Sequence, residues 1–257
     1  MAWDEIVREV TPYVVKIDTP SGHGTGFVFC YSADKGICGI ATARHVVSYA
    51  DQWQQPLRLN HHPSATSALL KEDDRFIDCD VDTDSAVILF STKMLDQLPK
   101  EPLPLLDDNE TLPTGAEVGW LGYPGIAALT LCFFSGIVSA RIPHGYLIDG
   151  VAINGVSGGP VVSYLPEKKT IQIVGTVSAY APNRATGDTL PGLSVAQDIS
   201  HFHESIAKIK SLDEANKKKQ IEEAERQAAA SSAASSPAPA PTAPAGAVQS
   251  GHARKKP

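Results

Sequence analysis

Residues 154–160 read Asn-Gly-Val-Ser-Gly-Gly-Pro, and this stretch lies between two apolar runs of strand length. A nucleophilic serine needs a tight turn whose backbone N–H groups face the oxygen that becomes negative during attack. Ser157 is therefore a candidate nucleophile, and the amides of Gly155 and Ser157 are candidate oxyanion-hole donors. The letters are GVSGGP rather than GxSxG, and no helical pattern follows, so the sequence excludes the nucleophile elbow of α/β-hydrolases.

Upstream of this stretch, residues 40–47 read Ile-Ala-Thr-Ala-Arg-His-Val-Val and place His45 at the C-terminal end of an expected strand. A general base that takes a proton from a serine hydroxyl needs a pKa near neutrality, and histidine is the usual choice. Taken alone, such a histidine is more often structural than catalytic. The catalytic role of His45 therefore depends on the presence of the other candidate residues.

Asp84 directly precedes the apolar run Ser-Ala-Val-Ile-Leu. A catalytic histidine needs a carboxylate on its second ring nitrogen, which holds the tautomer and stabilises the imidazolium. Asp78, Asp80 and Asp82 compete for this role, and the plain alternative is a polar loop that carries four acids. We favour Asp84 because the buried run beside it can fix its side chain under His45.

Short apolar runs dominate the chain from about residue 11 to 197, separated by Gly, Pro, Asn and Asp, which predicts an all-β fold. No run pairs with a long amphipathic helix, as a βαβ unit would require. The clearest runs are Tyr13–Thr19, Phe27–Tyr31, Gly36–Thr42, Ser85–Phe90, Glu117–Tyr123, Leu129–Ala140, Gly159–Tyr164, Ile171–Ala179 and Leu193–Gln197. The candidate residues follow the order His, Asp, Ser, which separates them from the orders found in α/β-hydrolases and subtilisins.

These segments together resemble the trypsin-like peptidases of the high-temperature-requirement (HtrA), or Deg, group. The similar blocks, in family order, are Gly24-Thr-Gly-Phe-Val-Phe, Thr42-Ala-Arg-His-Val-Val, Asp84-Ser-Ala-Val, Trp120-Leu-Gly-Tyr-Pro, Ser135-Gly-Ile-Val-Ser-Ala and Asn154–Pro160. The resemblance implies a chymotrypsin-like fold of two six-stranded β-barrels with the active site in the cleft between them. It also implies a serine endopeptidase that uses His45, Asp84 and Ser157 as a triad and needs no cofactor and no metal.

The sequence departs from the family at two positions near these blocks. Val156 stands where the residue before the nucleophile is usually an acid or Asn, so activation through a newly cleaved N-terminus is not expected. Val46 follows the histidine where secreted relatives carry a cysteine. The peptide-binding PDZ module common in the group is also not expected, because a charged segment stands where it would begin.

By position relative to Ser157, Val151 is expected at the base of the S1 pocket, with Ser178 and Tyr180 on its wall. Because Val151 carries no charge, the pocket would favour small or medium apolar P1 side chains over basic ones.

The domain organisation follows from changes in composition. Ile199, Phe202, Ile206 and Ile209 recur at helical spacing, and Pro interrupts the segment before residue 114. We expect a peptidase domain over 1–211 (barrels at about 10–95 and 115–198, linker 96–114, helix 199–211), a charged helical extension over 212–230 and a disordered Ala/Pro/Ser-rich tail over 231–257.

The composition limits the partners of the chain. Its net charge of −7 and the lack of a basic stripe make nucleic acid an unlikely partner and leave protein or peptide as the expected substrate. The start shows no signal-peptide pattern and no stretch suits a membrane span, so we expect a cytoplasmic protein with four free cysteines. The tail is a candidate segment for recruiting a protein partner, and the sequence leaves the oligomeric state open.

Two other readings remain open at this stage. The first is a pseudo-protease that binds peptide strands without useful turnover, suggested by the unusual Val156. The second is an esterase that uses the same three residues.

Overall fold

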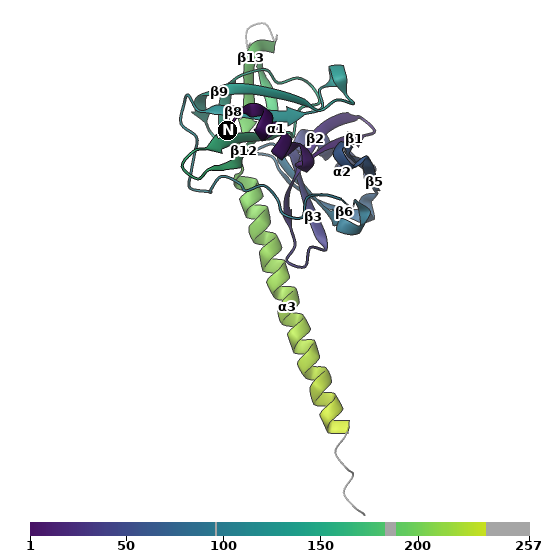
Figure 1. Cartoon of the computed structure of the whole chain (residues 1–257). Coiled ribbons are helices and arrows are strands. Elements are labelled where there is room, and N and C mark those ends of the chain that lie inside the picture. The colour runs from purple at the N-terminus through teal and green to yellow at the C-terminus, as the bar shows by residue number, and fades with distance from the viewer. Residues whose placement is uncertain (96, 183–188, 235–257) are drawn as a thin grey trace, which may run out of the picture. The chain divides into compact units, whose positions relative to one another are not determined.

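The computed structural model describes residues 1–95, 97–182 and 189–234, and the side chains of residues 180–191 and 229–234 lie outside the description. Most of the regular structure before residue 198 is β, as expected (Figure 1). Helix α3 (Ser200–Ala234) follows the last strand. The chain divides into two compact units, Met1–Asp213 and Glu214–Pro257.

The first half of the larger unit is a seven-stranded antiparallel sheet in the order β5-β4-β1-β2-β3-β7-β6. Its strands are β1 (Val14–Thr19), β2 (Gly22–Tyr31), β3 (Ile37–Ala43), β4 (Leu57–His61), β5 (Thr66–Leu70), β6 (Arg75–Asp80) and β7 (Ser85–Ser91). The expected barrel of six strands is here a sheet of seven, with β5 and β6 at its two ends.

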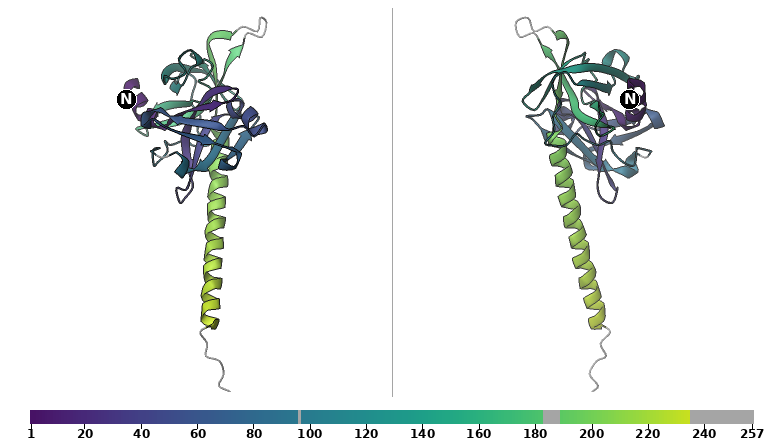
Figure 2. Two further views of the ribbon diagram at one scale, coloured as in Figure 1. Left: turned by 90° about the vertical axis from the view of Figure 1, so that its right-hand side faces the viewer. Right: turned by 60° about the vertical axis from the view of Figure 1, so that its left-hand side comes forward.

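The second half is a closed six-stranded barrel in the order β10-β13-β12-β11-β8-β9, as predicted. It consists of β8 (Glu117–Gly122), β9 (Cys132–Ile142), β10 (Gly145–Asp149), β11 (Pro160–Leu165), β12 (Thr170–Pro182) and β13 (Thr189–Gln197). Between the two halves lies a segment with one short 3₁₀ turn, η4 (Thr92–Met94), and an isolated bridge from Leu105 to Ile173. The views in Figure 2 show the two β halves from two further sides.

Short helical elements connect or flank these strands. The α-helices are α1 (Trp3–Val10) and α2 (Arg44–Gln52), and the 3₁₀ turns are η1 (Thr11–Tyr13), η2 (His62–Ser64), η3 (Glu72–Asp74) and η5 (Gly125–Ala127).

Strand β2 is buried on both faces and contributes side chains to both hydrophobic cores. Phe27 and Phe29 pack into the core that includes the second barrel, whereas Val28 points into the core of the first sheet. This division follows from the period of two along a strand, which sends alternate side chains to opposite faces. Strand β2 therefore belongs to the first sheet by hydrogen bonding and to both halves by packing.

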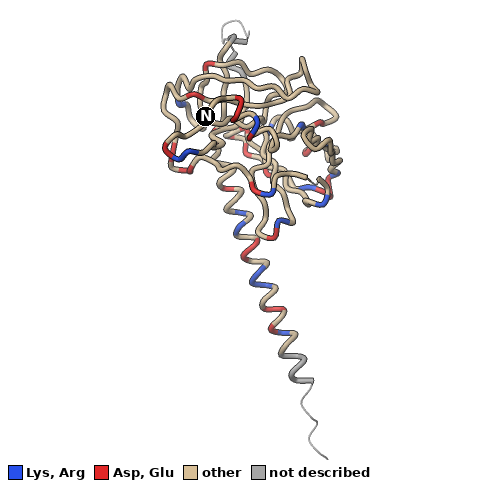
Figure 3. Tube along the Cα trace, in the orientation of Figure 1, with Lys and Arg blue, Asp and Glu red and all other residues tan. Residues whose placement is uncertain are grey.

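The apolar face predicted for the start of α3 packs on this same strand. Ile199, Phe202 and Ile209 are buried, and the ring of Phe202 lies 6.0 Å from that of Phe27 and 5.4 Å from that of Phe29. The expected helices over 199–211 and 212–230 form one continuous helix. Acidic and basic residues follow one another along the smaller unit's part of α3 (Figure 3).

The four cysteines are free, as predicted; Cys30 and Cys38 are buried, and Cys79 and Cys132 are partly exposed. Among the helices of the described residues, none combines the length and the apolar character that a bilayer crossing requires.

Candidate active site

Pairing of β3 with β7 brings the candidate base and its carboxylate together. The register matches Ala43 with Ser85, and the Arg44 amide donates to the Asp84 carbonyl at 2.7 Å. Strand β3 ends at Ala43 and α2 begins at Arg44, so His45 lies in the first turn of a helix rather than at the end of a strand as predicted. The helix start sets the direction in which the His45 side chain leaves the backbone.

Two hydrogen bonds join His45 to Asp84. The ring Nδ1 lies 2.7 Å from Asp84 Oδ2, and the backbone N–H of His45 donates to Oδ1 at 3.1 Å. Because a carboxylate only accepts, this contact assigns the proton to Nδ1 and leaves Nε2 of a neutral ring as a proton acceptor. The imidazole is 47% exposed, so Nε2 remains open to a reacting group.

Asp84 receives a third hydrogen bond, because the hydroxyl of Ser178 donates to its Oδ2 at 2.6 Å. Burial acts to raise the pKa of Asp84, but the hydrogen bonds from His45 and Ser178 outweigh burial and the pKa is lowered. The backbone of Asp84 has a φ of 47°, in the left-handed region that Asp tolerates better than most residues. Asp84 is thus held ionised and in a fixed orientation.

Two of the three acids that competed with Asp84 in the sequence have other partners, and the third, Asp82, is exposed. Asp80 accepts from the Asp82 amide and the Thr83 hydroxyl within its own turn. Asp78 forms an ion pair with Lys208 of α3 at 2.8 Å. The structure therefore places Asp84 at the candidate base and gives Asp78 and Asp80 structural contacts.

Ser157 lies in a turn between β10 and β11 and faces Ser178 of β12. Its Oγ donates to the Ser178 carbonyl at 3.3 Å. Although both side chains belong to the described residues, Ser157 and His45 do not share a hydrogen bond. Ser157 thus lies next to β12, the strand whose Ser178 hydroxyl donates to Asp84. The Ser157 hydroxyl itself points at the main chain of that strand. Catalytic hydrogen bonds are often unformed before substrate binds.

The amides of this turn fall into two groups. From Gly155 to Gly159, the amides of Gly155 and Ser157 have no acceptor within the described part of the chain, whereas the other three amides donate. Val156 donates to Ile153 at 3.0 Å, Gly158 to Val177 at 2.7 Å and Gly159 to Val156 at 2.9 Å. Gly155 has a φ of 93°, and a Cβ on it would lie 2.4 Å from the Tyr123 carbonyl oxygen, so glycine is required there. The Val156 side chain is fully buried in the core.

Of the three residues assigned to the S1 pocket, Ser178 contacts the nucleophile turn. Val151 is 48% exposed, and Ser178 is buried on β12. The backbone of Tyr180 pairs with Ser194 in the barrel, and its side chain lies outside the described residues. The assignment of these residues to substrate binding stays a prediction.

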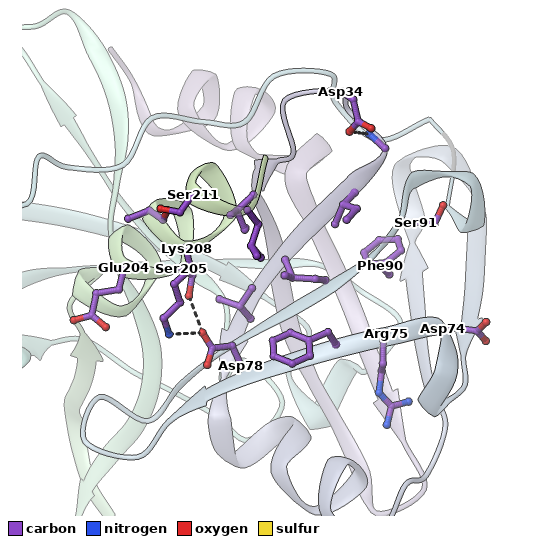
Figure 4. A pocket seen from close by; sticks show the side chains of 18 of the residues that line it. Asp34, Asp74, Arg75, Asp78, Phe90, Ser91, Glu204, Ser205, Lys208 and Ser211 are labelled. Atoms are coloured by element: carbon purple, nitrogen blue, oxygen red, sulfur yellow. Dashed lines mark hydrogen bonds and ion pairs between the residues drawn. The ribbon is translucent and has the colours of Figure 1, made fainter. Parts of the chain in front are cut away.

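A separate groove of about 1490 Å³ lies on the first sheet, and none of the candidate catalytic residues lines it. Side chains on one face of β3, β7 and β6, including Ile37, Leu89 and Phe76, form one wall, and residues 204–212 of α3 form the other. Figure 4 shows Lys208 and Ser205 reaching Asp78 at this groove. These contacts attach α3 to β6 within the larger unit.

Comparison with known proteins defines the class of this fold. The trypsin-like peptidase domain matches residues 24–166, which is more than half of the chain. The chain belongs to the trypsin-like peptidase domain family, and it is a hydrolase of the serine endopeptidase class.

Solved structures share the fold. A mutant of Rv3671c from M. tuberculosis H37Rv, in its inactive form, aligns with a TM-score of 0.55 and 23% identity over 79% of this chain and 89% of that one. The serine endoprotease from Yersinia pestis aligns with a TM-score of 0.59 and 21% identity over 81% of this chain and 66% of that one. Comparison with curated protein sequences gives no significant match.

Two contacts at the candidate site were not predicted from the sequence. Ser178 was expected only on the pocket wall, yet its hydroxyl reaches Asp84, 94 positions away. Thr25 was part of a recognised block, yet its hydroxyl reaches the carbonyl of Gly155, 130 positions away. A hydroxyl at the edge of each predicted apolar run, with Thr25 just before Phe27–Tyr31 and Ser178 near the end of Ile171–Ala179, was the available signal, but the sequence did not identify its partner.

Proposed function

We propose that Ser157, His45 and Asp84 hydrolyse peptide bonds through an acyl-enzyme. The observation that carries the proposal is the contact of 2.7 Å between His45 Nδ1 and Asp84, which frees Nε2 to act as a base. The position of Ser157 on a turn where its own amide and that of Gly155 have no acceptor supports it. The similarity of the fold to a serine endoprotease and to the inactive form of the Rv3671c protease supports it as well.

The reaction begins when the Ser157 side chain turns from the Ser178 carbonyl towards His45. The oxygen forms a bond to the scissile carbonyl carbon, and Nε2 of His45 takes its proton. Asp84 stabilises the resulting imidazolium, which then donates that proton to the leaving amine as the C–N bond breaks. Water attacks the acyl-enzyme by the same path, which releases the acid product and restores Ser157.

The amides of Gly155 and Ser157 form the oxyanion hole in this proposal. They would donate to the carbonyl oxygen as it becomes negative, where preformed donors act most strongly. Val151 contributes no charge to the S1 pocket, which supports a preference for small or apolar P1 residues over basic ones. The cytoplasmic location and a protein partner for residues 231–257 remain predictions.

Labelling with a fluorophosphonate probe tests the proposal directly. We expect the wild-type chain to react and to cleave members of an unbiased peptide library. Because triad members act as a unit, Ser157→Ala and His45→Ala should each lower peptidase activity by several orders of magnitude, with the fold intact by circular dichroism. Near-wild-type activity in either purified variant would overturn the assignment.

The same experiment separates the two competing readings. A pseudo-protease would bind library peptides but neither cleave them nor react with the probe. An esterase would react with the probe and hydrolyse ester substrates but leave all of the peptides intact.

A further inference from the structure

We propose that Thr25 is a positioning residue that holds the nucleophile turn in the geometry of an oxyanion hole. The inference rests on the proposed function and adds a residue to it. Thr25 lies on β2 of the first sheet, whereas the turn belongs to the second barrel. Thr25 acts through the main chain of the turn, so it is not itself a catalytic residue.

Thr25 makes two hydrogen bonds to the turn. Its hydroxyl donates to the Gly155 carbonyl at 2.8 Å, and its backbone N–H donates to the Ser157 carbonyl at 2.8 Å. The residue is fully buried, so water does not compete for either bond. Both carbonyls belong to residues whose own amides have no acceptor within the described chain.

The surroundings of Thr25 fix the direction of its hydroxyl. The Tyr123 amide donates to Oγ1 at 3.0 Å, which leaves the hydroxyl proton for Gly155. The Thr42 hydroxyl donates to the Thr25 carbonyl at 2.7 Å and fixes its backbone from the other side. A β-branched side chain also has few χ1 rotamers, so little entropy remains to be lost when the bond forms.

All four carbonyls from Asn154 to Ser157 accept a hydrogen bond. Besides the two from Thr25, the Gly125 amide donates to Asn154 at 2.6 Å and the Gly159 amide to Val156 at 2.9 Å. The Thr25 hydroxyl is the one side-chain donor among these four, as far as the described residues go. It holds the peptide group between the two free amides, and a rotation of that group would displace both.

A hydroxyl deletion of constant shape tests this role. Thr25→Val removes the donor to Gly155, together with the acceptor of the Tyr123 amide, and keeps the backbone bond to Ser157. Loss of a whole oxyanion-hole donor lowers kcat by about 10²–10³-fold. In Thr25→Val both donor amides are still present but displaced, so we expect kcat to fall by about 10–100-fold. KM should stay within about twofold, since the donors act in the transition state. Thr25→Ser keeps the hydroxyl and should restore kcat.

Thr176→Val is a matched control. Thr176 is also buried on a strand, but its hydroxyl has no hydrogen-bond partner among the described residues. This variant should keep wild-type kcat and wild-type affinity for a peptidyl boronic acid, which forms a tetrahedral adduct with a nucleophilic serine. Thr25→Val should bind the boronic acid less tightly, by about the same factor as its loss of kcat, because both measure donation to a tetrahedral oxygen.

Hydrogen exchange at the amides of residues 154–159 in the full-length chain gives a readout independent of turnover. We expect faster exchange there in Thr25→Val and unchanged exchange in Thr176→Val and Thr25→Ser. If Thr25→Val does not fold, Thr25→Ala takes its place. Unchanged kcat or unchanged exchange in the folded Thr25 variant would overturn the positioning role. A wild-type chain that does not react with the fluorophosphonate would instead overturn the proposed function. Hydrogen exchange at residues 154–159 would still show whether Thr25 holds the turn.

Discussion

Deletion of the Ser178 hydroxyl should weaken both the fold and the reaction through a single charged contact. Ser178→Ala removes the donor that lies 2.6 Å from Asp84 Oδ2 and leaves the carbonyl that receives Ser157. A hydrogen bond to a charged group contributes about 1.5–3 kcal/mol, and the partial exposure of Asp84 favours the lower end, about 1.5 kcal/mol. The same weakening of Asp84 as a partner for the imidazolium should lower kcat/KM by about tenfold.

The pH dependence of this loss identifies its cause. The pKa of Asp84 is lowered in the folded chain, so its contribution to stability is present above the ordinary Asp pKa of about 3.9 and is lost as the pH falls through the folded-state pKa. The stability difference between wild type and Ser178→Ala should therefore be full at neutral pH and shrink in acid. Urea unfolding at several pH values measures it.

Ser163→Ala is the matched control for this prediction. Ser163 is buried to the same extent and donates to the neutral carbonyl of Glu117 at 3.0 Å. Its loss should cost about 1 kcal/mol at every pH and leave kcat/KM unchanged. The reasoning fails if Ser178→Ala loses stability equally at pH 7 and in acid, or if its kcat/KM stays within twofold of wild type.

Three further predictions concern the cysteines, the core and the C-terminal tail. Burial raises the pKa of Cys30 and Cys38 to about 12 and that of Cys79 to about 11. At pH 8, iodoacetamide should therefore modify Cys132 of the folded chain first. Equally fast modification of Cys30, measured by peptide mass spectrometry, would contradict this. Phe202→Ala should lower the free energy of unfolding by about 3–5 kcal/mol, whereas ending the chain at residue 230 should change neither the melting temperature nor the rate of peptide cleavage. A melting temperature that falls with that truncation would show that the tail is structural.

Local sequence patterns were sufficient to predict the strands that consist of continuous apolar runs. The run around Phe27 to Phe29 and the run after Asp84 carry large apolar residues at buried positions, and both are strands. Strands β4 and β5 were missed because exposed polar residues such as Arg58 and Ser67 interrupt their short apolar patterns. Helix α2 was missed because its β-branched residues, Val46 and Val47, favour a strand in isolation.

The candidate site was predictable only as far as its motifs reach. The short blocks identified His45, Asp84 and Ser157, but the choice of Asp84 over Asp80 depends on the register between β3 and β7. The contacts of Ser178 and Thr25 join segments about a hundred positions apart, and the pattern of a single sequence does not indicate which distant residues come into contact. The direction of the Ser157 hydroxyl depends on the same tertiary contacts.

The left-handed backbone of Asp84 decides which substitution can test its charge. Alanine at this position would lose the carboxylate. It would also adopt a left-handed backbone conformation without the local side-chain hydrogen bonds that make this conformation tolerable for Asp, at a cost of about 1–2 kcal/mol. Asparagine accepts the same φ of 47° and nearly the same shape, so it changes the chemistry alone. We therefore expect Asp84→Asn to melt closer to wild type than Asp84→Ala and still lose most of its activity, because the amide favours the wrong tautomer of His45. Equal melting temperatures for the two variants would show that the backbone at this position carries no strain.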